Sequence, residues 1–246
     1  MSDDLYRLEL AISSREGLGT YEFEPVVADS RLFAKLADSR RSGNLTIVIG
    51  AGVSYPLGLE TWEQLVKSAA LKAIEGTAIP PAIVDKLSAL QIPLPAQVRF
   101  FESVLGVKAA FRSHLTESLY ATVNLDFSAN PTLIAIAETV LGVDGGRAVL
   151  NVITYNFDNL LELAIAEVAK RHGCHTEIVS VYSPALYRSS AKDGCINLFH
   201  PHGFIPHGEP FGPYLEFPLV FSENNYHQAT SIRPKLIKFI RRRSLC

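Results

Sequence analysis

The sequence predicts an α/β fold in which helices flank a parallel sheet. Short runs rich in β-branched residues alternate with helical patterns along the chain, which is typical of this class. The 246 residues are 48% hydrophobic and only 20% charged, so a substantial core can form and disorder is not expected. A nearly all-helical block around residues 76–147 predicts a helical subdomain inserted into the sheet domain.

The individual elements follow from local patterns. Segments of strand character are short and mostly apolar: residues 44–49, 148–154, 178–182, 196–200 and 218–221. Outside the helical block, apolar residues three and four apart predict helices at residues 30–41, 60–74, 158–171 and 223–243. Within the block, Asn130 and Pro131 open a helix that runs to residue 140. Residues 1–43 are therefore expected to be an extension with a leading helix, and residues 44–246 the sheet domain.

Charge and cysteine content exclude several classes of protein. The net charge of −2 argues against direct nucleic-acid binding, which normally requires a basic excess. The three cysteines are scattered, so neither a disulfide framework nor a cysteine zinc site is expected. The N-terminus is acidic, and no apolar run approaches the roughly 20 residues that cross a bilayer. We expect a cytoplasmic protein that does not contact membranes.

A glycine-rich turn follows the first strand. Gly50, Ala51 and Gly52 leave the backbone bare where a strand runs into a helix, and such turns bind phosphate through free N–H groups. The dinucleotide fingerprint G-x-G-x-x-G is not met, because Tyr55 occupies the third glycine position. An ordinary tight turn remains the alternative interpretation.

Polar residues also follow two later strands. Thr154, Asn156 and Asp158 come at the end of one strand, and one of the last two could cap the helix that follows. His200 and His202 end another strand, where alternation would place both side chains on one face. In a parallel sheet ligands bind beyond the carboxyl ends of the strands, so we expect these residues to face the glycine turn.

Three chemistries could use these residues. A serine hydrolase would combine Ser54, Asp158 and His202, although the G-x-S-x-G elbow is not met. A metal site would combine His200, His202 and Asp158, but no further ligand suggests itself. A dinucleotide held by the glycine turn would place Asn156 and His202 at its sugar.

Four segments together resemble a known family. In order and rough spacing they are similar to the motifs of sirtuin-like domains, and most similar to the bacterial branch found in antiviral defence proteins. The segments are GAGVSYPLGLETW (residues 50–62), TYNFD (154–158), HG (202–203) and PLVFSENNY (218–226). The resemblance spans roughly residues 44–226.

The resemblance implies a Rossmann-like sheet that binds NAD. The implied NAD-binding residues are Gly50, Ala51, Gly52, Ser54, Trp62 and Thr154. Asn156 would lie beside the nicotinamide ribose, Asp158 would support the pocket, and His202 would act as the general base. These roles suit the chemistry, because loss of nicotinamide develops positive charge on the ribose that nearby dipoles stabilise.

Departures from the family refine the expected activity. Deacylating sirtuins carry a four-cysteine zinc module that this chain cannot supply, so no zinc is expected and plain NAD hydrolysis is favoured. A Gly-Ser-containing strand usually follows the Tyr226 region and is missing, so the chain is either a fragment or builds the adenosine side differently. The implied protein is an antiphage effector that depletes NAD, gated by homo-oligomerisation or by a defence partner. A deacylase or ADP-ribosyltransferase, or a non-catalytic NAD- or ADP-ribose-binding module, is the alternative.

Overall fold

A computed structural model describes residues 30–104, 108–182, 195–208 and 219–220 of the chain. The extension at residues 1–29 and the helix predicted at residues 223–243 lie outside the described residues. Of the strand predicted at residues 218–221, only Leu219 and Val220 are described. The domain boundaries predicted above stay predictions.

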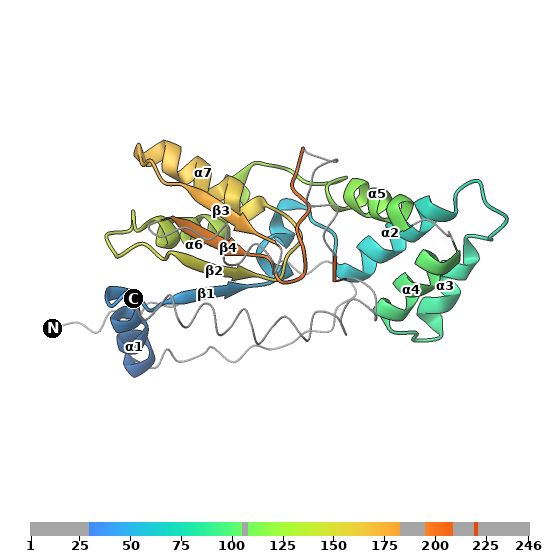
Figure 1. Cartoon of the computed structure of the whole chain (residues 1–246), viewed down its shortest axis with the longest axis horizontal. Helices are drawn as coiled ribbons and strands as arrows, with labels where there is room; N and C mark the ends of the chain where they lie inside the picture. The colour runs from blue at the N-terminus through green and yellow to red at the C-terminus, as the bar shows by residue number, and fades with distance from the viewer. Residues whose placement is uncertain (1–29, 105–107, 183–194, 209–218, 221–246) are drawn as a thin grey trace.

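Four parallel strands form the sheet at the centre of the molecule (Figure 1). The strands lie in the order β1-β2-β4-β3: β1 (Thr46–Ile49), β2 (Asn151–Thr154), β4 (Ile196–Phe199) and β3 (Ile178–Val181). Ile49 pairs with Thr154, and Ile153 pairs with Phe199, so the carboxyl ends of the three adjacent strands are in register. The predicted α/β fold with a Rossmann-like parallel sheet is confirmed, although each strand is shorter than its apolar run.

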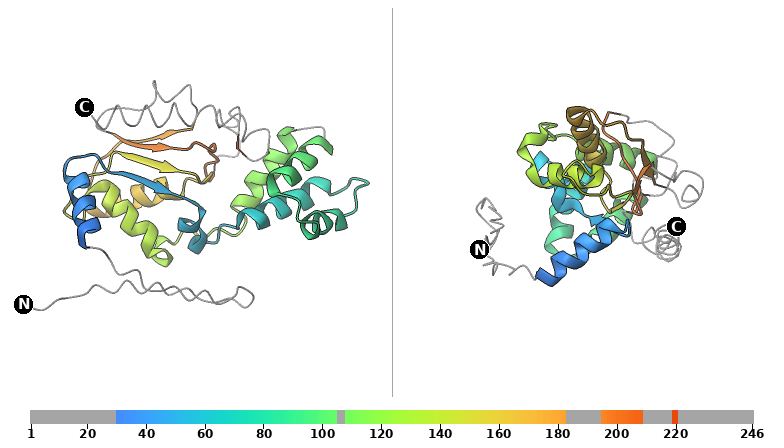
Figure 2. Two further views of the ribbon diagram at one scale, coloured as in Figure 1. Left: turned by 90° about the horizontal axis from the view of Figure 1, so that it is seen from below. Right: turned by 90° about the vertical axis from the view of Figure 1, so that its left-hand side faces the viewer.

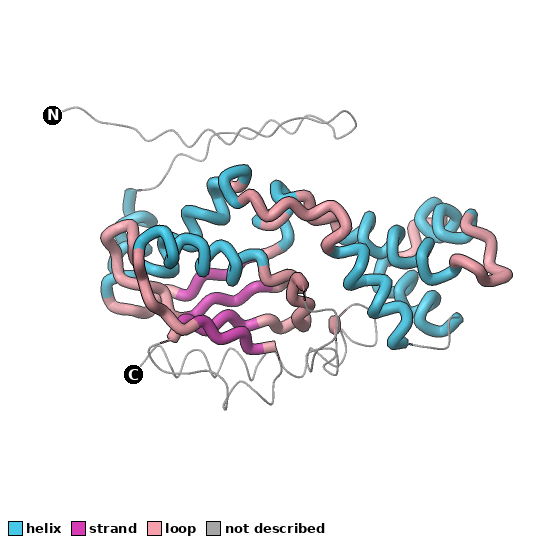
Figure 3. Tube along the Cα trace, turned by 90° about the horizontal axis from the view of Figure 1, so that it is seen from above, coloured by secondary structure: helices cyan, strands magenta, loops and turns pink. Residues whose placement is uncertain are grey.

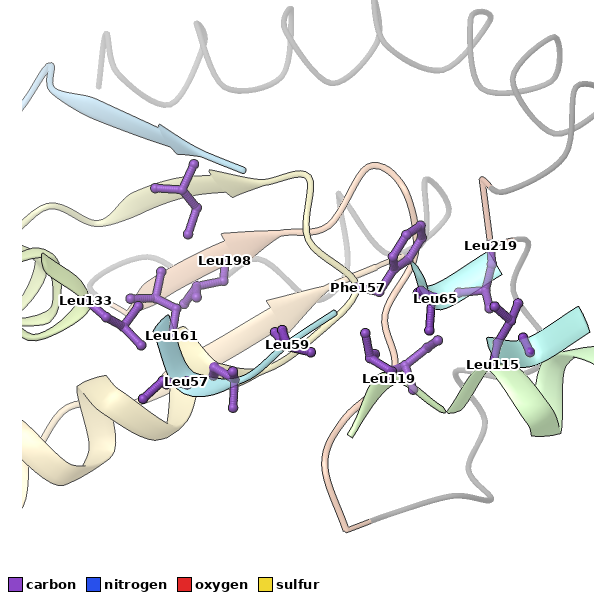
Figure 4. Packing of buried hydrophobic residues seen from close by; sticks show 14 of the residues in the cluster. Leu57, Leu59, Leu65, Leu115, Leu119, Leu133, Phe157, Leu161, Leu198 and Leu219 are labelled. Carbon is purple, nitrogen blue, oxygen red and sulfur yellow. The ribbon is translucent and has the colours of Figure 1, made fainter. Parts of the chain in front are cut away.

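Two helices cover one face of this sheet (Figure 2). They are α6 (Pro131–Leu141) and α7 (Leu160–His172), which pack against each other. Both are amphipathic, and their apolar faces bury Leu133, Leu161 and Ile165 against the sheet, where Leu198 of β4 is fully buried (Figure 4). Helix α1 (Ser30–Arg41), found at its predicted bounds, precedes β1 and buries no residue of its own.

Four helices form a lobe on the side toward which the strands point (Figures 1 and 3). They are α2 (Trp62–Ile74), α3 (Ala82–Ala89), α4 (Leu94–Val104) and α5 (Lys108–Leu119). Helix α2 packs against both α4 and α5 and buries Leu65 and Ala69, which lie one turn apart. Leu57 and Leu59, in the segment before α2, join the core of this lobe to that of the sheet. The chain therefore reaches the lobe directly after the glycine turn.

The helices are all short. None in the described parts of the chain has the length and apolar character of a membrane-spanning helix.

Candidate functional site

The glycine turn differs from its predicted form. Gly50 is followed by two 3-10 turns, η1 (Ala51–Val53) and η2 (Tyr55–Leu57), and the α-helix begins only at Trp62. Thr61 caps that helix reciprocally with Gln64. Helix α2 therefore begins two residues after its predicted start at residue 60, and the two 3-10 turns separate it from Gly50, so an α-helix dipole gives no reason for anion binding at the glycine turn.

Open space lies beside both glycines of the turn. A Cβ added at Gly50 or Gly52 would meet no atom of the described residues within 4 Å, and neither glycine has a positive φ. Backbone conformation and crowding by the protein are the usual reasons for a glycine, and neither applies at these two positions. The bare backbone leaves room for a ligand to approach closely, and Ala51 between the two glycines is small and exposed as well.

Three predicted site residues meet directly beyond the ends of β1 and β2. The Ser54 hydroxyl donates to Asp158 Oδ1 at 3.1 Å, and Asn156 Nδ2 donates to Ser54 Oγ at 3.0 Å. All three side chains are buried, with relative exposures of 2% for Ser54 and 5% for Asn156 and Asp158. We call this group the Ser54 cluster. It joins the glycine turn to the loop after β2, as the sequence predicts.

A hydrogen bond fixes the backbone of Asn156, whereas its side-chain oxygen has no partner among the described residues. Its N–H donates to Thr154 Oγ1 at 3.1 Å, so buried Thr154 shapes the loop. Asn156 Oδ1 is buried and has no hydrogen-bond partner among the described residues. A buried amide oxygen is costly unless it accepts a hydrogen bond, so this atom is suited to a hydrogen-bond donor on a ligand.

Burial dominates the electrostatics of Asp158. The pKa of the Asp158 carboxyl is raised to about 6, chiefly by burial and also by the charge of Glu162, while hydrogen bonds from Leu160 N–H and Ser54 and the charge of His200 act in the opposite direction. The bond from Leu160 N–H is 3.0 Å long and lies at the first turn of α7. Asp158 therefore both supports the Ser54 cluster and helps to cap α7, although Asn159 occupies the N-cap position itself.

His202 reaches the same loop through aromatic contacts. Its ring lies edge-on to Tyr155, with centroids 4.9 Å apart, and 6.3 Å from Phe157. Trp62 stacks on Phe157, which follows Asn156 in the chain, and the two ring centroids are 5.9 Å apart. The structure thus brings His202 and Trp62 to the two residues that flank Asn156, and the contacts are ring contacts.

The two histidines lie in different surroundings. β4 ends at Phe199 and residues 201–202 form a turn, so strand alternation does not reach His202. His200 is fully buried, with Nε2 2.7 Å from Glu162 Oε1 and Nδ1 3.3 Å from the carbonyl oxygen of Asn156. The expectation of one shared face is wrong because the chain turns immediately after the strand.

Two of the open chemistries lose their support. The single proton of Ser54 is donated to Asp158 rather than to an imidazole, which is not the arrangement of a serine hydrolase. Both ring nitrogens of His200 face protein oxygens, which removes the main ligand of the metal site. Nowhere in the described ranges do three His, Cys, Asp or Glu side chains gather as a metal ion would need.

Sequence reasoning missed residues that brace the site. Asn130 not only caps α6 but also donates from Nδ2 to the carbonyl of Val53 at 2.6 Å, which fixes η1. The hydroxyl of Tyr120, just after α5, accepts from Asn159 N–H and contacts the carbonyl of Ile205. The Asn-Pro pair signalled a helix start, but no local pattern signals contacts across 77 or 85 residues.

Fold and site together define a class of protein: a Rossmann-like α/β domain with a ligand site at the carboxyl ends of its strands. Residues 150–246 match the family model of the SIR2-like domain, and this match supports the predicted sirtuin-like family. SIR2-like domains are generally enzymes with NAD as a substrate. The match contains Asn156, Asp158 and His202 but not the glycine turn. No curated protein matches the chain.

Proposed function

We propose that this protein is an NAD hydrolase, which cleaves the bond between nicotinamide and ribose and yields nicotinamide and ADP-ribose. The observation that carries the proposal is the Ser54 cluster, in which the buried oxygen of Asn156 has no partner among the described residues. Asn156 and Asp158 of this cluster lie in the part of the chain that matches a family with NAD as a substrate, and the cluster lies beyond the strand ends where such ligands bind.

The residues suit each part of the substrate. The open space beside Gly50 and Gly52 accepts the pyrophosphate, whose oxygens can approach the bare backbone. The rings of Trp62 and Phe157 are already stacked on each other and border the loop of Asn156. We then assign the nicotinamide ribose to the space between the side chains of Asn156 and His202.

The reaction needs a polar group at the ribose and a proton acceptor. As the C–N bond breaks, its electron pair goes to the nicotinamide nitrogen, and positive charge develops on the ribose. The oxygen of Asn156 stabilises that charge and positions the attacking water. The water forms the new C–O bond at the anomeric carbon, and His202 takes up its proton.

Incubation of purified protein with NAD and separation of the products tests the proposal. We expect equal amounts of nicotinamide and ADP-ribose. Nicotinamide together with acetyl-ADP-ribose, formed only when an acylated peptide is added, would assign a deacylase instead. ADP-ribose attached to protein would assign a transferase, and NAD binding in calorimetry without nicotinamide release would assign a binding module.

The cellular role that we propose follows the resemblance to defence proteins. We infer that the enzyme is a cytoplasmic antiphage effector, which stays inactive until oligomerisation or a partner protein activates it. Cells that carry the wild-type protein should lose NAD after phage infection, and cells that carry Asn156→Ala should not. Unchanged NAD in both would reject the defence role without affecting the enzymatic proposal.

A further inference from the structure

A second polar group lies beneath the Ser54 cluster. His200, at the end of β4, is fully buried and bridges Glu162 of α7 to the backbone carbonyl of Asn156, at 2.7 Å and 3.3 Å. Ser180 of β3 donates to the same Glu162 oxygen at 2.9 Å. One chain of hydrogen bonds therefore ties three secondary-structure elements to the loop that carries Asn156.

The hydrogen-bond roles in this chain follow from the groups themselves. A carbonyl oxygen only accepts, so His200 Nδ1 must carry a proton where it faces Asn156. A carboxylate also only accepts, so one further proton must lie between His200 Nε2 and Glu162. The pair is electrically neutral as a whole whichever of its two members holds that proton. His200 is consequently fixed as a donor to the Asn156 backbone.

Stability alone does not explain the pair. Buried ionic pairs can often be replaced by apolar side chains without loss of stability. Here the second oxygen of Glu162, Oε2, is buried without a partner in the described part of the chain, which is an added cost. The arrangement nevertheless controls the orientation of one particular peptide group, that of Asn156.

We propose that His200 and Glu162 are positioning residues. They hold the backbone of Asn156 so that its side chain stays bonded to Ser54 and its side-chain oxygen keeps one orientation in the site. The inference rests on the proposed function of the site, because it concerns the residue assigned to the ribose. Its physical core, the control of Asn156 by His200, can be measured independently of any activity.

Two substitutions of His200 separate positioning from stability. The side-chain amide nitrogen of asparagine falls near the position of His200 Nδ1. His200→Asn therefore keeps the hydrogen bond to the Asn156 carbonyl and loses the hydrogen bond to Glu162. The side-chain amide nitrogen of glutamine falls near the position of His200 Nε2. His200→Gln therefore keeps the hydrogen bond to Glu162 and loses the hydrogen bond to the Asn156 carbonyl. We expect His200→Asn to be the less stable of the two, because it leaves Glu162 buried without its partner.

Activity should follow the opposite order. His200→Gln should lower kcat for nicotinamide release by about 10- to 100-fold with little change in KM, the usual cost of losing an orienting partner. His200→Asn should stay within about 5-fold of wild type. A purely structural role predicts that activity follows the melting temperature, with His200→Gln the more active variant, and that order would overturn the proposal.

Hydrogen exchange of the Asn156 side-chain NH2 provides the readout that needs no substrate. Its two NMR signals are identified as those lost in Asn156→Ala. We expect protection in wild type and His200→Asn, and fast exchange in His200→Gln; equal protection in all three would also overturn the proposal. If wild type releases no nicotinamide while this pattern holds, the proposed function fails and the positioning role stands.

A second pair covers the case in which a His200 variant does not fold. Glu162→Gln still contacts Nε2 and should retain kcat and protection, whereas Glu162→Leu should lose both. Equal kcat and equal protection in these two variants would overturn the positioning role of Glu162.

Discussion

Two polar clusters in this molecule are built in opposite ways. Arg40 of α1 binds Asp144, in the segment between α6 and β2, through two hydrogen bonds of 2.5 and 2.6 Å. Arg40 also donates to the carbonyls of Thr139 and Arg147. This hydrogen-bonded contact raises the pKa of Arg40 and holds the pKa of Asp144 below its usual value. Both groups are thus favoured in their charged forms.

The Ser54 cluster shows the reverse. Burial raises the pKa of Asp158 to about 6, and the oxygen of Asn156 is buried without a partner in the described residues. Native proteins satisfy most buried polar groups, so a cluster that does not is held in place at a cost in stability. The first cluster thus fastens a helix through satisfied charges, whereas the second holds buried polar atoms that a well-packed core would avoid, as expected for the ligand site that we propose.

The largest expected effect comes from removing the two groups assigned to the reaction. Asn156→Ala and His202→Ala should each lower kcat for nicotinamide release by about 100-fold or more, the usual cost of a lost dipole or general base. Turnover assays by product separation measure this effect. Asn151→Ala is the matched control, because Asn151 lies at the opposite end of β2 and its side-chain oxygen is likewise buried without a partner in the described chain. Control activity as low as that of Asn156→Ala would contradict the assignment.

Next in size is the pH dependence contributed by Asp158. Its pKa is about 6 in the folded state, against an ordinary value of 3.8 for an exposed aspartate, so the folded state binds more protons between these limits. The free energy of unfolding should therefore fall as pH rises from about 4 to 6, by about 3 kcal/mol at ~1.4 kcal/mol per unit. Urea titrations should show this fall in wild type and not in Asp158→Asn. Parallel curves for the two proteins would contradict the buried carboxyl.

The glycine turn gives a smaller effect on binding. Gly52→Ala adds a methyl group into open space, so the melting temperature should stay within about 2 °C while KM for NAD rises about 10-fold. Gly173→Ala is the contrasting control, since its φ of +63° favours glycine and the substitution should cost about 1 kcal/mol of stability. Its KM should not change. An unaltered KM in Gly52→Ala would remove the ligand from this turn.

The smallest effect is expected at the other cluster. Arg40→Met should lower the free energy of unfolding by about 1 kcal/mol, because the ion pair is partly exposed, and should leave nicotinamide release unchanged. The folded pKa of Asp144 is lowered, so its contribution is present above pH 4 and is lost as pH falls through that lower value. The difference in stability between Arg40→Met and wild type should thus shrink in acid. A difference that grows below pH 4 would contradict this account.

Much of the fold could be predicted because it depends on local patterns. The period of the apolar residues located α1 and α2 and the positions of the strands along the chain, and the strand exits indicated where Ser54 and Asn156 would meet. The predicted ends of the elements were less accurate. Pairing in the sheet decides where a strand ends, and the cap at Thr61 decides where α2 begins. The turn after Phe199, which separates His200 from His202, has no local signal.

By itself the sequence determined the α/β class, the resemblance to sirtuin-like domains and the candidate residues that form the Ser54 cluster, because side-chain type and spacing are written in the chain. Only the tertiary structure decided how these residues are satisfied: that Ser54 donates to Asp158, that burial raises the pKa of this carboxyl, and that His200 holds Asn156. The physical reason is that burial and hydrogen-bond partners arise from segments 38 to 104 residues apart in the chain. Those environments exist only once the chain has folded.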